Sequence, residues 1–309
     1  MTASRNPRVS PYLVLIVGIF AVSSGSILAR LAQDEGVPSL VIAAGRTLVA
    51  ALILLPFMLT RRMDEIRAMR AADWRLAFLS GIALAIHFAT WITSLSYTSV
   101  AASTVLVSTS PLWVALAAPF FLREPFTRWL KIGMTLALVG TMIISLESIV
   151  GVENGRFLLN TTDLATGQQP LLGSALALIG GLAAAIYLLI GRKLRPRLSL
   201  TSYAALVYGT ASMCLVLVIW LTGNSMLGYS PQVYLLFLAL GVVPQLMGHS
   251  SFNYALGYLP AASVGITIFA EPITASIMAL ILFGEQPAMM VVLGSVIVLV
   301  GVLVSIVYQ

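Results

Sequence analysis

Long runs of apolar residues dominate the chain, and short polar segments interrupt them. Ten of these runs are long enough to cross a bilayer, because a spanning α-helix needs about 20 mainly apolar residues. The pattern predicts an all-α membrane protein with transmembrane helices near residues 11–31, 38–59, 74–96, 99–122, 128–147, 170–191, 200–222, 232–256, 260–284 and 287–308. Turn signals such as Gly36-Val37-Pro38 and Gly228-Tyr229-Ser230-Pro231 separate several of the runs.

The composition changes this picture little. Of the 309 residues 59% are hydrophobic and 9% are charged, whereas a soluble domain has roughly 25% charged residues. Lipid must therefore cover much of the surface. The net charge of +6 is no sign of a nucleic-acid partner, since the basic residues lie in short loops between apolar runs. The single cysteine, Cys214, lies inside an apolar run and forms neither an internal disulfide nor a metal-ligand pattern. The run that follows Arg8 is predicted to be the first transmembrane helix rather than a signal peptide.

The basic residues predict the orientation in the membrane. Cytoplasmic loops of membrane proteins are enriched in Lys and Arg. With the N-terminus inside, the outer loops contain only Arg156, and Arg30 and Arg46 lie within predicted helices. The other fourteen of the seventeen fall in cytoplasmic segments: Arg5, Arg8, Arg61, Arg62, Arg67, Arg70, Arg75, Arg123, Arg128, Lys131, Arg192, Lys193, Arg195 and Arg197. We therefore expect a multi-pass protein of the inner (plasma) membrane with both termini in the cytoplasm.

An internal repeat appears when the chain is shifted by 161 residues. The two halves then align without a gap and match at Pro111 with Pro272, Glu124 with Glu285, Gly133 with Gly294, and Gly140 with Gly301. Because each copy has an odd number of helices, the second copy must be inverted in the membrane. The prediction is two inverted five-helix repeats, at 11–147 and 170–308, joined by an outer linker at 148–169. Many secondary transporters are built in this way and bind substrate near the midplane between the repeats.

Local motifs in both halves resemble the EamA branch of the drug/metabolite transporter superfamily. The motifs are Thr98 to Ser103, Ser110-Pro111-Leu112-Trp113, Arg123-Glu124-Pro125, Ala261-Ala262-Ser263-Val264, Glu271-Pro272-Ile273, Phe283-Gly284-Glu285-Gln286 and Ala44-Gly45-Arg46-Thr47. The resemblance covers almost the whole chain as two EamA units. It implies export or exchange of small metabolites, often amino acids, by alternating access. One departure is Ser24-Gly25, where the family usually has Trp-Gly and thus an aromatic wall.

Two charged residues are predicted deep in the membrane. Glu271 lies about 15 Å into its helix and Arg46 about 12 Å from the outer end of its own, at 1.5 Å per residue. A carboxylate near the midplane must be paired, hydrated or protonated, so Glu271 is a functional candidate by default. The alternative for Glu271 is a buried structural acid. Arg46 has three possible partners: a substrate carboxylate, Glu271, or backbone carbonyls in helix packing.

Two histidines, His87 and His249, fall near the same depth. With Glu271 they form a set that suits a proton relay or a transition metal. The alternative is that each is a hydrogen-bonded packing residue. They stand one position apart in the repeat register, which predicts different helix faces. We group His87 with Arg46 and Glu271 as the coupling or charge-pair residues.

The resemblance places a central cavity between helices 1, 3, 4, 6, 8 and 9. The predicted substrate-binding residues there are Ser24, Trp91, Ser110, Tyr187, His249, Asn253 and Glu271. Pro111 and Pro272 fall about halfway along helices 4 and 9. Each proline lacks an N–H and leaves the carbonyl four residues earlier without its helical donor. The two are predicted to be hinges that line the pathway, and the alternative is a pair of static kinks.

The function predicted from these features is secondary transport of a small metabolite without a cofactor or a resident metal. The expected surroundings are lipid and a small-molecule substrate, and the chain is expected to act as a monomer because its repeats already form a pseudo-dimer. Alternatives are a membrane enzyme acting on a lipid, a metal-ion transporter, and a scaffold or receptor. The predicted interfacial loops hold no nucleophile–base pair, and the sequence has no phosphate-binding Gly loop, which argues against catalysis and ATP-driven transport.

Overall fold

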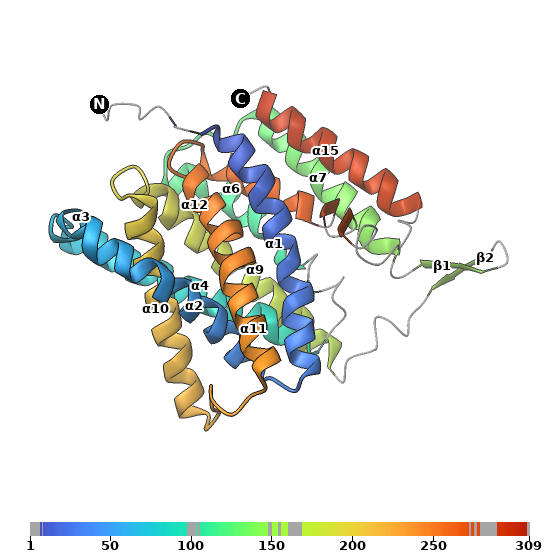
Figure 1. Cartoon of the computed structure of the whole chain (residues 1–309). Helices are drawn as coiled ribbons and strands as arrows, with labels where there is room; N and C mark the ends of the chain where they lie inside the picture. Colours follow the sequence, from blue (N-terminus) through green and yellow to red (C-terminus); the bar gives the residue numbers. More distant parts are fainter. Residues whose placement is uncertain are drawn as a thin grey trace.

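The computed structural model describes residues 7, 9–97, 103, 106–147, 150–153, 156–159, 169–271, 273–274, 277–278 and 289–307. Nearly all of these residues are helical (Figure 1). A small hairpin of β1 (Val150–Glu153) and β2 (Arg156–Leu159) is not helical, and it lies in the predicted outer linker. Its strands pair antiparallel, with Val150 opposite Leu159.

The helices of the first half are α1 (Pro11–Asp34), α2 (Ser39–Arg61), α3 (Met63–Arg67), α4 (Ala71–Ser94), α6 (Ser110–Phe121) and α7 (Arg128–Glu147). Long apolar sequences form α1, α2, α4 and α7 close to the predicted ranges. The predicted helix 99–122 differs, because a turn at residues 108–109 precedes α6. Pro111 therefore lies in the first turn of α6 rather than halfway along a helix. Its missing N–H costs nothing at that position.

The helices of the second half are α9 (Pro170–Leu194), α10 (Leu200–Leu221), α11 (Pro231–Leu240), η1 (Gly241–His249), α12 (Ser250–Ala255), α13 (Ala261–Ile266), η2 (Thr267–Ala270) and α15 (Met289–Val307). The first of the two η segments is π-helical and contains Pro244, which cannot donate a backbone hydrogen bond. Together α11, η1 and α12 form one continuous rod over the predicted span 232–256. Pro272, the second predicted hinge, lies outside the described residues.

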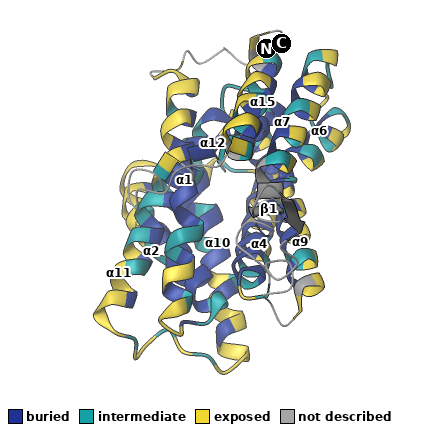
Figure 2. Ribbon diagram, turned by 90° about the vertical axis from the view of Figure 1, so that its right-hand side faces the viewer, coloured by how far each residue is buried: buried dark blue, intermediate teal, exposed yellow. Residues whose placement is uncertain are grey.

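The outer faces of the helices are exposed (Figure 2), and they carry many large apolar side chains. Phe120 is 84% exposed and Trp220 is 74% exposed, an arrangement that lipid stabilises and water does not. Within the described residues, six helices are long and apolar enough to cross a membrane: Pro11–Asp34, Ser39–Arg61, Ala71–Ser94, Leu171–Leu194, Leu200–Leu221 and Pro231–Ala255. The chain is therefore a multi-pass membrane protein, and the count of ten spans stays a prediction.

Glycines bring α7 and α15 into contact, and Figures 1 and 2 show these two helices side by side. A β-carbon added at Gly140 would lie 2.6 Å from the carbonyl oxygen of Gly294, and one at Gly301 would lie 2.5 Å from that of Gly133. No larger residue fits at these positions without a backbone shift. The pairing of the earlier glycine of each helix with the later glycine of the other also makes α7 and α15 antiparallel.

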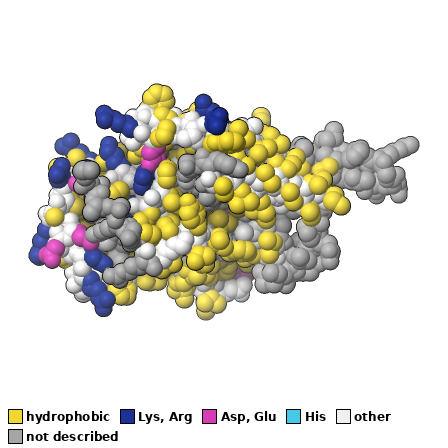
Figure 3. Space-filling model, turned by 90° about the horizontal axis from the view of Figure 1, so that it is seen from above, with side chains coloured by type: hydrophobic (Ala, Val, Ile, Leu, Met, Phe, Trp, Pro, Cys, Tyr) yellow, Lys and Arg dark blue, Asp and Glu magenta, His cyan; other side chains and the backbone are white. Residues whose placement is uncertain are grey.

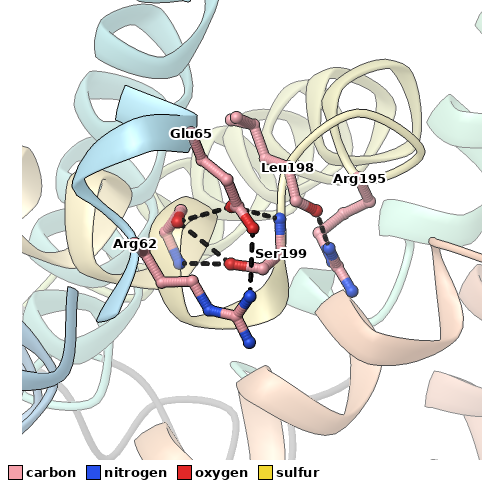
Figure 4. A network of polar contacts seen from close by, with 6 residues as sticks. Arg62, Glu65, Arg195, Leu198 and Ser199 are labelled. Atoms are coloured by element: carbon pink, nitrogen blue, oxygen red, sulfur yellow. Dashed lines mark hydrogen bonds and ion pairs between the residues drawn. The ribbon is translucent and has the colours of Figure 1, made fainter. Parts of the chain in front are cut away.

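Basic side chains gather at one end of the molecule, the side on which α3 lies in Figure 1, and hydrophobic side chains cover much of the rest (Figure 3). A polar network joins α3 to the start of α10 at this end (Figure 4). The Ser199 N–H and the Ser202 hydroxyl donate to Oε2 of Glu65 over 2.9 and 2.7 Å, and Arg62 lies 3.3 Å from Oε1. Burial raises the pKa of Glu65, but these hydrogen bonds and the Arg62 charge outweigh it and lower the pKa below its usual value.

Candidate functional site

A cavity lies at the centre of the bundle, between α1, α2, α4, α6, α9 and the η1–α12 rod. Both halves of the chain contribute to its wall. The lining residues are Val22, Ser23, Ser26, Arg46, His87, Trp91, Val107, Ser110, Ala184, Tyr187, Leu188, His249, Phe252, Ile268 and Glu271. The wall is mainly apolar and carries a cation, a carboxylate, two imidazoles and several hydroxyl groups. Such a mixture binds and orients a small organic molecule.

The structure brings most of the predicted site residues to this cavity. Five of the predicted substrate-binding residues line it, namely Trp91, Ser110, Tyr187, His249 and Glu271, and so do the predicted coupling residues Arg46 and His87. Their roles stay predictions. The other two, Ser24 and Asn253, are absent from the lining, and Pro111 lies in the α6 turn that begins beside Ser110.

Ser24 and Asn253 do not line the cavity, and each forms a hydrogen bond elsewhere. Successive helical residues differ by about 100° in direction, so Ser23 and Ser26 face the cavity and Ser24 does not. The Ser24 hydroxyl donates to the Ala21 carbonyl on its own helix, 2.7 Å away. Asn253 lies in a layer behind the wall and accepts a 2.7 Å hydrogen bond from the Tyr187 hydroxyl.

Sequence reasoning missed the apolar part of the wall, including Val107, Leu188 and Ile268. Phe252 was identifiable, because the 161-residue shift places it on Trp91, and both aromatic rings line the cavity. Ser23 and Ser26 lie on α1 together with Ser24, and the sequence alone does not distinguish which of the three serines line the cavity. The rotation of α1 about its own axis, which packing determines, decides which serines face the cavity.

Two contacts fix the position of the Arg46 side chain. It is 1% exposed, and its Nε donates to Oε1 of Gln245 over 3.0 Å. Its guanidinium carbon lies 4.0 Å from the centroid of the Phe88 ring, a cation–π contact. The guanidinium group also lies close to α1, since a β-carbon at Gly25 would be 3.8 Å from Nη1. Within the described part of the chain, Nη1 and Nη2 have no hydrogen-bond partner.

Glu271 follows the short 3-10 turn η2 and faces the same cavity. Its backbone carbonyl accepts hydrogen bonds from Ser23 and Thr274, over 3.2 and 3.0 Å, which ties this turn to α1. The carboxylate interacts electrostatically with Arg46, but the ion pairs among the described residues do not include these two. A functional charge pair of Arg46 and Glu271 stays a prediction.

The two histidines share the cavity wall, and their ring centroids lie 6.0 Å apart. The expectation of different faces is wrong, because His87 comes four residues before Trp91 and His249 three residues before Phe252. Both spacings place side chains on one helix face. Nδ1 of His87 forms a 2.9 Å hydrogen bond with the Gly180 carbonyl. Within the described residues, no group of three or more His, Cys, Asp or Glu side chains is placed to hold a metal ion.

A buried polar layer supports the wall from behind. The Asn253 amide donates to the Tyr208 hydroxyl over 3.2 Å, and Tyr208 and Ser250 share a 3.1 Å hydrogen bond. Together with the Tyr187 contact, these bonds connect α9, α10 and α12. Satisfied buried networks rigidify their surroundings, so the layer holds one side of the cavity in a fixed shape.

An ion pair closes the bundle at the basic end. Nε of Arg192 lies 2.6 Å from Oε1 of Glu124, and Nη1 of Arg192 donates to the Leu256 carbonyl over 3.0 Å. The other carboxylate oxygen of Glu124 accepts the Ala261 N–H at the start of α13, 2.9 Å away. One charged pair thus joins the ends of α6, α9, α12 and α13.

These features define a polytopic helical membrane protein with a polar site inside its bundle. Residues 9–146 and 171–307 both match the model of the EamA-like transporter family. The chain belongs to this family.

Relatives agree with this assignment. The uncharacterized transporter YdfC of Bacillus subtilis is 22% identical over 93% of this chain and 87% of its own length. The uncharacterized transporter YwfM of the same organism is 25% identical over 94% of this chain and 91% of its own. A crystal structure of a protein superposes with a TM-score of 0.72 over 98% of this chain and 99% of that chain, at 15% identity. That likeness shows the fold alone.

Proposed function

We propose that the protein is a secondary transporter that exports a small metabolite across the inner membrane by alternating access. The observation that carries the proposal is the central cavity, to which both halves of the chain contribute and whose wall holds the carboxylate of Glu271 and the cation of Arg46. Nη1 and Nη2 of Arg46 have no hydrogen-bond partner among the described residues. A buried charge is costly in a membrane protein unless it is paired, hydrated or neutralised, so charged residues in an internal cavity are candidates for function. The family and the names of its relatives point to transport rather than catalysis.

The proposal includes ten transmembrane helices in two inverted repeats. Its support is a set of packing contacts that occur twice. Gly133 and Gly301 contact each other, and the 161-residue shift turns this pair into Gly294 and Gly140, which also contact each other. A two-fold axis in the membrane plane produces such an exchange of partners.

A second pair of contacts supports the same axis. Gly18 on α1 packs against Ser251 and the Gly248 carbonyl, and Gly180 on α9 packs against Thr90 and the His87 carbonyl. Shifts of 161 or 162 residues relate every member of one contact to its equivalent in the other. The α1 contact with the η1–α12 rod thus has its counterpart in the α9 contact with α4.

The proposed orientation has both termini in the cytoplasm. The start of α1 and the end of α15 lie at the same end of the molecule (Figures 1 and 2), and the basic side chains gather over α3 (Figure 3). The Glu124–Arg192 ion pair then closes the cytoplasmic side. Its opening, with movement of the helices about the turn before Pro111 and about Pro272, would expose the cavity to the cytoplasm.

A flux measurement tests the proposal. Cells with the wild-type chain and cells with an Arg46→Ala/Glu271→Ala variant at equal membrane levels are compared for metabolites released into the medium. Candidates are then tested for counterflow in liposomes that contain only the purified protein. The expected result is at least one solute that wild type moves and the variant does not. Equal release profiles for wild type, variant and empty membranes would refute the transport function.

A further inference from the structure

We propose that Arg46 is the anion-binding residue of the cavity and that the substrate is a monocarboxylate with an apolar body. The carboxylate oxygens accept hydrogen bonds from Nη1 and Nη2 of Arg46. This inference rests on the proposed transport function and specifies the substrate class of the same site.

The first argument is the fixed orientation of the guanidinium group. Gln245 holds Nε at 3.0 Å, and the Phe88 ring lies 4.0 Å from the guanidinium carbon. An edge contact and a face contact together determine the plane of the group. The edge formed by Nη1 and Nη2 is left without a partner in the described structure. A planar fork with two free N–H groups matches the two oxygens of a carboxylate.

The second argument is the chemistry of the other unpartnered atoms. Among the described residues, Nε1 of Trp91 and Nδ1 of His249 are also buried without a hydrogen-bond partner, and both residues line the cavity. An indole N–H is only a donor, and an imidazole nitrogen donates in one tautomer. Buried donors without acceptors are costly. The site thus has an excess of donors, which a ligand rich in acceptor oxygens satisfies and an amine does not.

The third argument concerns the part of the substrate beyond its carboxylate. Glu271 faces the same space and repels a second negative charge, which disfavours dicarboxylates. The remaining wall includes Val22, Leu188, Phe252 and Ile268. These apolar side chains suit a hydrocarbon or aromatic body. A monocarboxylate with such a body uses both parts of the wall.

Ligand pairs of equal shape test the charge requirement. Purified wild-type protein in detergent is heated with benzoate or benzamide, 3-phenylpropanoate or 3-phenylpropanamide, hexanoate or hexanamide, and with succinate and 3-phenylpropylamine. Intrinsic tryptophan fluorescence reports unfolding and, in titrations, the Kd. We expect at least one carboxylate to raise the Tm and to bind at least about tenfold more tightly than its amide. Equal binding of acids and amides, preference for succinate or the amine, or no stabilisation by any acid would overturn the proposal.

Variants then test the residue. Arg46→Lys keeps the charge and loses the two-pronged fork, so we expect about tenfold weaker acid binding, and Arg46→Gln should abolish the preference for acid over amide. Arg30→Gln is the matched control, since Arg30 is an exposed arginine of α1 that pairs with Asp34. If Arg46→Lys folds and binds the acids like wild type, Arg46 is not the anion site. The comparison of acid and amide on wild type stands even if Arg46→Gln does not fold.

The two proposals fail differently. If liposome counterflow finds a transported cation or neutral solute whose flux Arg46→Lys leaves unchanged, the substrate class is wrong and the transport function stands. If a carboxylate binds in an Arg46-dependent way but never crosses the liposome membrane, the anion site stands and the transport function is wrong.

Discussion

The cavity and the basic end of the bundle use charge in opposite ways. At the basic end, Glu65, Glu124 and Asp73 all have charged or N–H partners within 3.4 Å. In the cavity, Arg46 and Glu271 share the same space without direct contact. Paired charges at the basic end hold helices together, whereas Nη1 and Nη2 of Arg46 in the cavity have no hydrogen-bond partner among the described residues. This difference in hydrogen bonding is why we propose a binding role for Arg46 and not for the residues of the basic end.

The largest expected effect comes from removing the cavity carboxylate. Glu271→Gln keeps size and hydrogen bonding but cannot change charge. If Glu271 carries a proton during transport, uphill flux driven by a pH gradient should fall at least about 100-fold, which corresponds to about 2.7 kcal/mol, while downhill exchange survives. Flux is measured against pH in liposomes at matched protein levels, with Glu35→Gln, an exposed acid beyond α1, as control. Identical pH profiles would leave Glu271 a structural residue.

The next effect concerns the contact of α7 with α15. Gly140→Val places a side chain where the Gly294 carbonyl already lies, and overpacking of this kind costs about 1–3 kcal/mol. Gly209→Val is the matched control, because a β-carbon at Gly209 meets nothing within 4 Å. Thermal unfolding in detergent should show a lower Tm for the first variant and a small change for the second. Equal Tm values would mean that the tight glycine contact does not stabilise the fold.

A smaller effect is expected from the ion pair that closes the basic end. Glu124→Gln and Arg192→Gln each remove part of the closure, and a shift of about 1 kcal/mol between closed and open states changes accessibility about fivefold. A cysteine at Ser110 in a Cys214→Ser background should react faster with a reagent added from the cytoplasmic side. The control is Arg62→Gln, which breaks a more exposed pair at the same end. Unchanged labelling in both closure variants would contradict a gating role.

The smallest effect is a pH dependence at Glu65. The folded pKa lies below the usual value of 4.5, so this carboxylate stabilises the fold above pH 4.5 and loses that contribution as the pH falls through its folded pKa. Glu65→Gln should cost about 0.5 kcal/mol at pH 7, a modest figure because the group is partly solvated. Unfolding midpoints between pH 3 and pH 7 check this. A wild-type curve parallel to that of Glu65→Gln would remove Glu65 from the pH response.

The comparison also shows what sequence reasoning can reach. Apolar run length located α1, α2 and α4, because lipid forces backbone polar groups into helices. Counting residues along the helices picked out Arg46 and Glu271, which both line the cavity. The side-chain contacts could not be predicted from the sequence, because the rotation of each helix about its axis depends on packing against segments that are distant in the chain.

The cavity wall illustrates that limit. Asn253 was predicted to line the cavity, but it lies in a layer behind the wall, where it accepts a hydrogen bond from Tyr187 of another helix. The one-position offset of His87 and His249 in the repeat did not put them on different faces. His87 lies four residues before Trp91 and His249 three residues before Phe252, and both spacings keep side chains on one helix face. Pro111 looked like a mid-helix kink until a turn before it made it a helix start. Each error came from an interaction that local periodicity does not encode.

The antiparallel contact of α7 with α15 has a consequence for biosynthesis. The α7 surface that carries Gly133 and Gly140 leaves the ribosome long before α15 exists. Until then a flat face of bare backbone stays open to lipid or to other helices. The face cannot be covered by α7 of another newly made copy that enters the membrane in the same direction, because the two would run parallel. Within the chain α15 supplies the reversed partner, so we expect assembly of the first half to finish when synthesis of the second half does.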